Sequence, residues 1–196
     1  LVAEPPGGSD EELSRRQQVA RDTQLGALRL SQVERGSDPA DSIAGVSFRH
    51  LAMLAQIKSG DEGVWASLRK SGHLDGGARD ALTSRLRRMR NWIEGAHFPE
   101  AARVVIQSEV SDEARANLTD EHGAFLSSLS GALSGCDWDE VSIGACIKRV
   151  ASDVGIGNRN AYIALYWVLL GRDYGPRVAS LMAEVDREMI LSIIQQ

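Results

Sequence analysis

The sequence predicts an all-α protein, a multi-helix bundle or helical cage built from two subdomains. Several segments repeat apolar residues at helical spacing, and residues that cap helices precede most of them. The only run of β-branched residues, Val104 to Ile106, is too short to build a sheet. No segment repeats at a fixed period, which argues against a solenoid.

The composition is that of a globular protein with a hydrophobic core. Of the 196 residues, 43% are hydrophobic and 25% are charged, which argues against disorder of the whole chain. The net charge of −5 argues against an evenly basic surface but is compatible with a local basic face. Cys136 and Cys146 fit neither a zinc site nor a disulfide framework. We find no signal peptide and no membrane span, and we expect a cytoplasmic protein.

The first predicted subdomain covers residues 9–107 and follows a linker, residues 1–8. Such a start is compatible with a piece of a longer protein. Residues 9–35 are polar and helix-prone, and they begin with a capping-box pattern. Residues 46–58 are a short apolar helix, and Asp61 is expected to cap the helix that follows.

The longest predicted helix runs from Asp75 to Glu94. Its apolar residues recur at i, i+4, i+7 and i+11, which indicates one core-facing stripe, formed by Leu82, Leu86, Met89 and Ile93. The composition changes over residues 98–112, where we expect the first subdomain to end.

The second predicted subdomain covers residues 108–196. Thr119 is expected to cap one helix, and Asp137 with Glu140 forms a variant capping box for the next. Apolar residues again recur at helical spacing in that second helix, at Ile143, Ile147, Val150 and Val154. A terminal helix is expected to begin near Asp186.

The stretch from Gly155 to Arg177 organises the rest of the chain. Ala161 to Leu170 is interrupted only by two tyrosine hydroxyls and one indole N–H, which predicts a helix buried on every side. Asn158 is a good N-cap, and Gly171 suits the left-handed position after the last turn. Pro176 fits the first turn of a further helix.

Arginines dominate the predicted helix from Arg79 to Trp92. On a helical wheel, Arg85, Arg88 and Trp92 lie on one flank of the apolar stripe, and Arg87 and Arg90 lie on the other. Guanidinium groups bind phosphates, and an aromatic ring beside them stacks on an unpaired base. The alternative is a solvated basic face with a partly buried tryptophan.

A second candidate site brackets the central helix. Arg159 lies at its start, and Arg172, Tyr174 and Arg177 follow its end. A rigid helix with arginines at both ends is a good platform for a flexible partner. The alternative is that Arg159 and Arg177 pair with nearby carboxylates such as Asp173. No phosphate-binding loop and no nucleophile elbow is present.

Three segments together resemble the C-terminal half of class I lysyl-tRNA synthetases. They are VSFRHLAMLAQIKSGD (46–61), MRNWIEGAHFPE (89–100) and NRNAYIALYWVLLGRDYGPRVASLMAEVDREMI (158–190), and they occur in the order that this family uses. The resemblance extends over about residues 9–196. The related glutamyl-tRNA synthetases share a looser version of the last segment.

The resemblance implies a helical cage that grips the anticodon arm of lysine tRNA. In the family, a separate catalytic domain activates lysine with ATP. This chain has no signature histidine motif and no lysine-rich loop of that domain, so we expect no cofactor, no metal and no aminoacylation by the chain alone. The candidate RNA-binding residues within matching segments are Arg90, Asn91, Trp92, Arg159, Asn160, Arg172, Tyr174 and Arg177.

The resemblance does not carry over individual roles, but the chemistry of base recognition gives expected ones: the two aromatic residues stack, the two asparagines read base edges, and the arginines hold phosphates. Besides the tRNA, the expected partner is the protein's own catalytic domain. A stand-alone relative of the domain, used as a protein-interaction or regulatory module, is the second hypothesis. An unrelated helical enzyme is the third.

Overall fold

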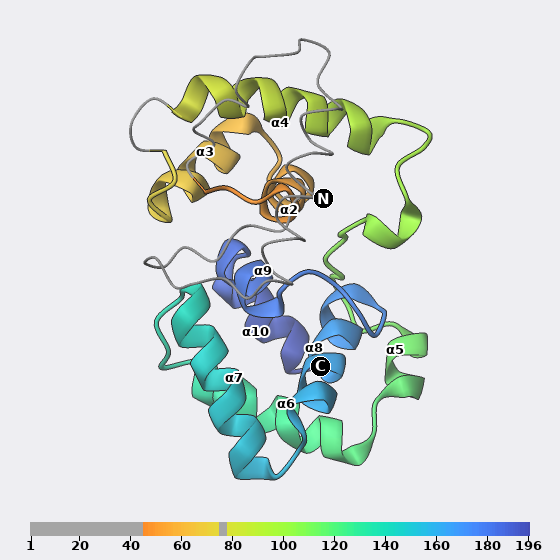
Figure 1. Ribbon diagram of the computed structural model, residues 1–196. Coiled ribbons are helices and arrows are strands. Elements are labelled where there is room, and N and C mark those ends of the chain that lie inside the picture. The colour runs from red at the N-terminus through yellow and green to blue at the C-terminus, as the bar shows by residue number, and fades with distance from the viewer. Residues whose placement is uncertain (1–44, 75–77) are drawn as a thin grey trace, which may run out of the picture.

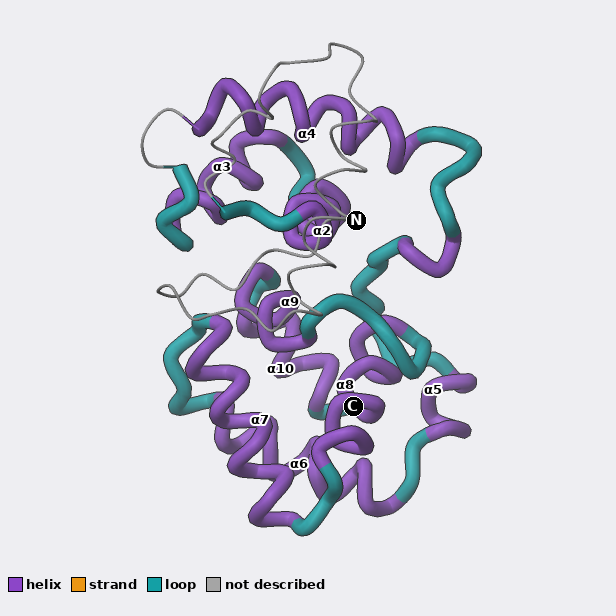
Figure 2. Tube along the Cα trace, viewed as in Figure 1, coloured by secondary structure: helices purple, strands orange, loops and turns teal. Residues whose placement is uncertain are grey.

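The computed structural model describes residues 45–74 and 78–196. These ranges contain α-helices, one short 3-10 helix and no strand, so the all-α prediction is confirmed for them (Figures 1 and 2). The linker predicted at residues 1–8 and the helix predicted at 9–35 lie outside the described residues. The helices are α2 (Phe48–Ile57), α3 (Asp61–Lys70), α4 (Ala78–Glu94), η2 (Glu100–Ala102), α5 (Asp112–Asn117), α6 (Asp120–Leu133), α7 (Glu140–Val154), α8 (Asn158–Leu170), α9 (Val178–Glu184) and α10 (Arg187–Ile194).

Helices α2, α3 and α4 lie together at one end of the molecule, and α5 to α10 form the other part (Figure 1). Helix α2 packs against both α3 and α4, and it also contacts α9 of the larger group. Helix α8 contacts α5, α6, α7, α9 and α10, so the predicted central helix does organise the larger group. The predicted subdomain boundary at residue 107 stays a prediction.

The predicted apolar stripes form the core. In α4, Leu82, Leu86 and Met89 are buried, and Ile93 packs against the core as a partly buried residue. The same holds for the α7 stripe, where Val154 is the partly buried member. Thr119 caps α6 as predicted, and its capping box is completed by His122, whose side chain accepts from the Thr119 amide. Asp186 caps α10.

Three predicted N-caps are displaced by one or two residues, those of α3, α7 and α8. Helix α7 is capped by Asp139 rather than Asp137, because Asp139 Oδ1 accepts from the amides of Val141 and Ser142, both at 2.9 Å. These hydrogen bonds hold the pKa of Asp139 below its ordinary value. Helix α3 has Gly60 at its N-cap position, so Asp61 is already the first helical residue.

The ends of the central helix also differ in detail from the prediction. Gly157 occupies the N-cap of α8 and Asn158 is its first residue, while Gly171 has the predicted left-handed conformation with φ of 65°. Helix α9 begins at Val178, so Pro176 precedes the helix instead of opening it. The carbonyl of Pro176 accepts a hydrogen bond from the Tyr166 hydroxyl at 2.7 Å.

The expectation that α8 is buried on every side is wrong for one side. Ala161, Leu165 and Leu169 are fully buried, but Tyr162, Ile163, Tyr166 and Trp167 are only partly buried. The aromatic side chains on that side carry polar groups that favour the edge of the core over its centre. The short acidic helix α5 was not predicted, because six residues are too few to show an apolar period.

Candidate nucleic-acid interface

A row of aromatic rings and arginine side chains leads from α4 to the loop after α8. The Trp92 ring meets the Phe98 ring edge to face, with centroids 4.7 Å apart, and the Arg103 guanidinium lies 5.2 Å from the centre of Phe98. Arg172 donates from Nη2 to the Arg103 carbonyl at 2.6 Å, and its guanidinium lies 4.6 Å from the centre of the Tyr174 ring. We call these five residues the aromatic–arginine row.

The segment between η2 and α5 fixes the middle of this row. Gln56 of α2 accepts from the Val104 amide at 2.8 Å and donates to the Ala102 carbonyl at 3.3 Å. Further along, the Gln107 amide donates to the Leu169 carbonyl of α8 at 2.9 Å. The segment is therefore hydrogen-bonded to α2 at one end and to α8 at the other, so Arg103 has a defined position.

The loop that carries Tyr174 is closely packed against α8. A Cβ atom added at Gly175 would lie 2.5 Å from Leu170 Cδ1 and 2.9 Å from Tyr166 Cε1, so only glycine fits there without a shift. The Tyr166 ring cannot swing away freely, because its hydroxyl is bonded to Pro176. Burial raises the pKa of this hydroxyl, with a smaller contribution from Tyr162. It therefore stays a neutral hydrogen-bond donor at neutral pH.

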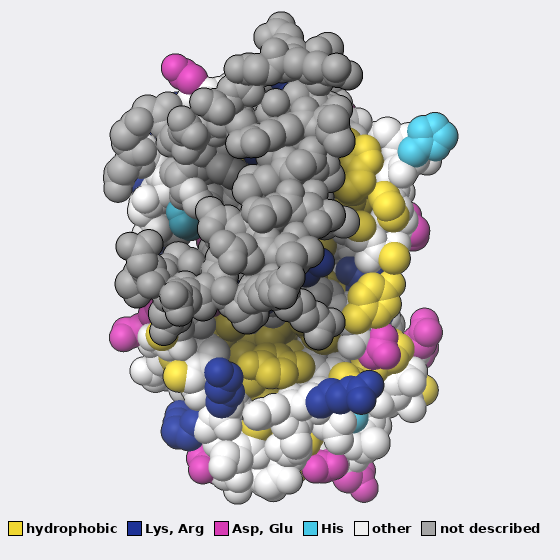
Figure 3. Space-filling model, viewed as in Figure 1, with side chains coloured by type: hydrophobic (Ala, Val, Ile, Leu, Met, Phe, Trp, Pro, Cys, Tyr) yellow, Lys and Arg dark blue, Asp and Glu magenta, His cyan; other side chains and the backbone are white. Residues whose placement is uncertain are grey.

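The two ends of the row are open to solvent. Trp92 is 40% exposed and Tyr174 is 49% exposed, whereas Phe98 between them is buried. On the face in Figure 3, hydrophobic and basic side chains lie next to one another along one side of the molecule. Exposed rings beside guanidinium groups are the combination on which unpaired bases stack in single-stranded nucleic acid complexes.

Two of the predicted arginines donate hydrogen bonds to backbone carbonyls of the protein. Arg90 donates from Nε to Asp61 Oδ1 at 2.8 Å and from Nη1 to the Ala55 carbonyl at 3.0 Å. Arg172 donates to the carbonyls of Ala101 and Arg103. These guanidinium groups bind neighbouring segments together, while Arg90 Nη2 and Arg172 Nε are buried without a hydrogen-bond partner among the described residues. Arg103, whose Nε pairs with exposed Glu100 at 2.8 Å, lies in the row although it was not predicted.

The remaining predicted residues are exposed but do not gather in one place. Asn91 lies on α4 beside Trp92. Arg159 and Asn160 lie in the first turn of α8, about 20 Å along the helix axis from the loop at its other end. Arg177 is 87% exposed and pairs with Glu140 of α7 at 3.6 Å, and not with Asp173 as the alternative had suggested.

Sequence reasoning missed Phe98 and Arg103. Phe98 follows Trp92 by six residues and was interpreted only as the end of a helix. Because a turn and not a helix separates these two rings, no periodic pattern indicated that they meet. A Trp-x5-Phe spacing around a glycine was the one available signal.

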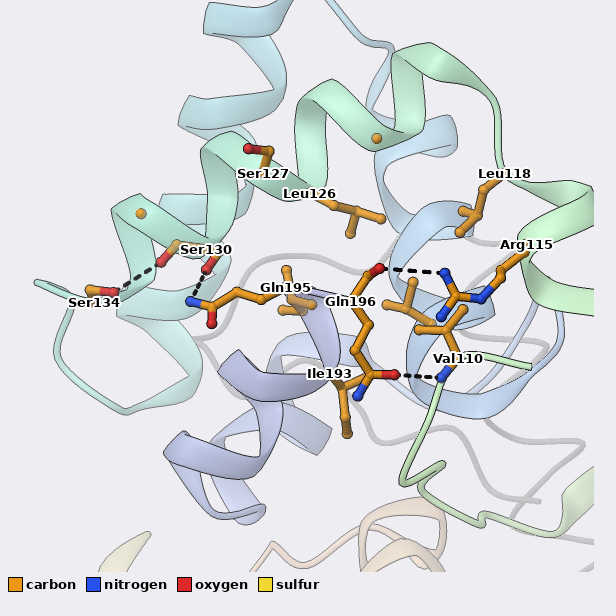
Figure 4. A pocket seen from close by; sticks show the side chains of 14 residues that line it. Val110, Arg115, Leu118, Leu126, Ser127, Ser130, Ser134, Ile193, Gln195 and Gln196 are labelled. Carbon is orange, nitrogen blue, oxygen red and sulfur yellow. Dashed lines mark hydrogen bonds between the residues drawn. The ribbon is translucent and has the colours of Figure 1, made fainter. Parts of the chain in front are cut away.

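A separate hollow of about 580 Å³ lies between α5, α6 and α10 (Figure 4). Gln195 donates to Ser130 Oγ at 2.9 Å across it, and Gln196 accepts from the Val110 amide at 2.9 Å. Arg115 lies at its edge and donates to the Gln196 carbonyl. None of the predicted RNA-binding residues lines this hollow.

The described residues offer little for other chemistry. Within residues 45–74 and 78–196, no three histidine, cysteine, aspartate or glutamate side chains gather where they would hold a metal ion. Among the helices of the same ranges, none has the length and apolar character that crossing a bilayer requires. Burial and the neighbouring Cys146 raise the pKa of the Cys136 thiol, which disfavours the reactive thiolate.

Comparison with known proteins assigns a family to this arrangement. Residues 65–196 match the family described as "Anticodon binding domain". The chain is also similar to proteins named lysine–tRNA ligase. It is 26% identical to that of Thermoplasma volcanium over 152 residues, which is 76% of this chain and 29% of the relative.

Two further lysine–tRNA ligases give similar values. The protein of Archaeoglobus fulgidus is 29% identical over 147 residues, covering 74% of this chain and 29% of the relative. The protein of Treponema pallidum is 29% identical over 165 residues, covering 82% of this chain and 30% of the relative. The chain thus spans less than a third of the length of these relatives.

Proposed function

Because this chain belongs to the anticodon-binding domain family, we propose that it binds the anticodon arm of a tRNA, and that this tRNA is lysine tRNA. The family match covers more than half of the chain, and the named relatives are lysine–tRNA ligases. Since the chain spans less than a third of those proteins, a ligase activity with ATP and lysine as substrates is proposed only for a longer protein that contains this region.

The aromatic–arginine row is the observation that carries the proposal. In an anticodon loop, bases are unpaired and can leave the stack to lie on protein rings. Trp92 and Tyr174 supply two exposed rings, and Asn91 lies next to Trp92 with an amide that both donates and accepts. These are the groups we propose for base contact.

The arginines divide into two roles under this proposal. Arg103 is partly exposed, and its pair with Glu100 is a surface pair of low strength, so a phosphate can replace the carboxylate. Arg90 and Arg172 are positioning residues, because their donors hold backbone carbonyls. Arg159, Asn160 and Arg177 lie away from the row, and we propose them as contacts to the phosphates of the arm outside the loop.

The proposal is tested by binding of the 196-residue chain to a labelled anticodon stem-loop of lysine tRNA over a series of salt concentrations. A stem-loop with the same stem and a scrambled anticodon is the matched control. We expect tighter binding to the lysine anticodon at every salt concentration. Equal and steeply salt-dependent binding to both RNAs would limit the activity to phosphate contacts, and no binding would overturn the proposal.

A further inference from the structure

Helices α2 and α4 enclose a groove that the row does not account for. Its volume is about 360 Å³, and buried Leu51 and Leu82 form its apolar floor. Phe48 and Trp92 stand at its rim, and Arg85 and Arg88 line it from α4. Phe48 is the first residue of α2, and it is 52% exposed.

The groove is continuous with the aromatic–arginine row through Trp92. The Phe48 and Trp92 ring centroids lie 5.7 Å apart with the planes tilted by 49°. Trp92 is thus shared: one neighbour ring, Phe98, belongs to the row, and the other, Phe48, belongs to the groove. The groove therefore adjoins the Trp92 end of the row.

The arginines of α4 fall into two classes. Arg79 and Arg90 pair with Glu62 at 3.3 Å and with Asp61 at 2.8 Å. Arg85 and Arg88 are exposed and have no ion-pair partner in the part of the chain that the structure describes. Among the described residues, no carboxylate lines the groove either. The groove therefore joins an apolar floor to two positive charges that no carboxylate of the described residues pairs with, in a chain of net charge −5.

We propose that this groove holds one unpaired base of the bound RNA, with Arg85 and Arg88 on the phosphates that flank it; the inference rests on the proposed function. A base has two apolar faces for the floor and the Phe48 ring, and its phosphates supply the charge that Arg85 and Arg88 lack. An acidic peptide would satisfy the same charges, but the shared ring of Trp92 favours RNA.

The lining residues also determine whether the groove can discriminate between the four bases. Its side chains are apolar or, as in the arginines and the Trp92 indole, only donate hydrogen bonds. With Arg85 and Arg88 engaged on the phosphates, the Trp92 indole N–H is the one side-chain donor left among the lining residues, and it can pair with a hydrogen-bond acceptor that every base carries. The groove therefore grips a base by its faces and accepts any of the four.

The first test uses the 196-residue chain and the lysine anticodon stem-loop. The double variant Arg85→Gln/Arg88→Gln removes both charges, and Arg87→Gln is the matched control because Arg87 is exposed on the same helix and does not line the groove. We expect the double variant to bind about tenfold more weakly and to reduce the slope of log K against log salt by about 1.4, the value for two single-strand phosphates. Arg87→Gln should keep the parent affinity within about twofold.

A second test separates base contact from charge. Stem-loops with an abasic nucleotide at each loop position in turn are bound to the parent chain and to Phe48→Ala. At one loop position, the abasic change should lower the affinity of the parent chain about fivefold. It should leave the affinity of Phe48→Ala unchanged, which is the coupling expected for direct contact. Replacing that base by any other should change the affinity less than about twofold.

The outcomes distinguish the two proposals. If the parent chain does not bind the stem-loop, the proposed function fails, and the groove inference fails with it. If the parent binds and Tyr174→Ala weakens it, but Arg85→Gln/Arg88→Gln behaves like Arg87→Gln, only the groove inference is overturned. A strong preference for one base at the coupled position would contradict the inference that the groove accepts any of the four bases.

Discussion

Lys58 and Glu184 join the two groups of helices through an ion pair and a hydrogen bond. Lys58 Nζ lies 3.2 Å from Glu184 Oε2 and donates to the Glu184 backbone carbonyl at 2.6 Å. Ser67 Oγ donates to the same carboxylate. Lys58 follows α2 and Ser67 belongs to α3, whereas Glu184 ends α9, so one glutamate connects two of the three helices of the smaller group to the larger one.

Replacing Lys58 by methionine should lower the stability of the whole chain. The side chains of Lys58 and Glu184 are only 24% and 13% exposed, so the substitution leaves a half-buried carboxylate with one partner fewer. We expect a loss of about 1–3 kcal/mol in the free energy of unfolding, measured by urea denaturation. Lys148→Met on the exposed side of α7 is the control and should change stability by less than about 0.5 kcal/mol.

Tyr174→Ala should weaken binding to the anticodon stem-loop by about 1–3 kcal/mol, the range for one stacked base. Tyr174→Phe keeps the ring and should bind nearly as well as the parent. Fluorescence anisotropy measures both, and circular dichroism checks that the helices are intact. Equal weakening by both variants would mean that the hydroxyl, and not the ring face, contacts the RNA.

Arg172 should act through Tyr174 and not on its own. Its Nη1 and Nη2 bond to two backbone carbonyls while its face lies against the Tyr174 ring. We therefore expect Arg172→Ala to weaken RNA binding, and the double variant with Tyr174→Ala to bind no worse than Tyr174→Ala alone. Arg172→Lys should not restore binding, because an ammonium group cannot make both bonds and also stack. Additive losses would show that Arg172 contacts the RNA directly.

Asp139 should make stability depend on pH in the acid range. Its pKa is lowered in the folded protein by the Ser142 and Val141 amides, so the carboxylate form stabilises the fold. This contribution is fully present above the unfolded-state pKa, about 3.9, and it is lost as the pH falls through the lower folded-state pKa.

Asp139→Asn keeps an acceptor at the cap, so it should cause only a small loss of stability at pH 7. Because asparagine does not titrate, it should also remove this part of the pH dependence of stability in the acid range. Asp139→Ala removes the acceptor altogether and should lower the stability at pH 7 more than Asp139→Asn does. Urea denaturation at a series of pH values measures both. An acid-range slope that persists in Asp139→Asn would assign the titration to another carboxylate.

Gly175→Ala adds only one methyl group, but it should impair RNA binding. The added Cβ collides with Leu170 and Tyr166, and relief of these contacts moves the neighbouring Tyr174. We expect a stability loss of about 1–3 kcal/mol together with weaker stem-loop binding. Gly135→Ala, in the loop after α6 where nothing lies within 4 Å of the added atom, is the matched control. Unchanged RNA affinity in Gly175→Ala would show that the loop relaxes without moving its tyrosine.

Much of the fold could be predicted because periodic burial and capping are local signals. The α4 and α7 stripes, the Thr119 and Asp186 caps and the left-handed Gly171 all depend on residues within a few positions of one another. The errors at Asp137 and Pro176 arose where tertiary contacts select the start of a helix. Trp138, for example, donates to the Val185 carbonyl and so holds the residue before Asp139 outside the helix.

The candidate site was less predictable, because it depends on contacts between distant segments. The Trp92 and Tyr174 rings chosen from the sequence are exposed in the structure, but the residues that link them belong to an irregular segment without periodicity. The structural roles of Arg90 and Arg172 also depend on contacts with distant segments. In the sequence they are indistinguishable from free arginines, and only their carbonyl partners identify them as structural.

The hydrogen bonds along residues 102–107 have a consequence for the thermodynamics of recognition. Gln56 and the Leu169 carbonyl hold this segment from both sides, so the spacing between the exposed rings is set before any ligand arrives. A rigid receptor loses little conformational entropy on association, and the ordering then falls on the flexible partner. Stiffening the RNA loop in its bound shape should therefore tighten the complex, whereas stiffening this segment of the protein further should leave the affinity as it is.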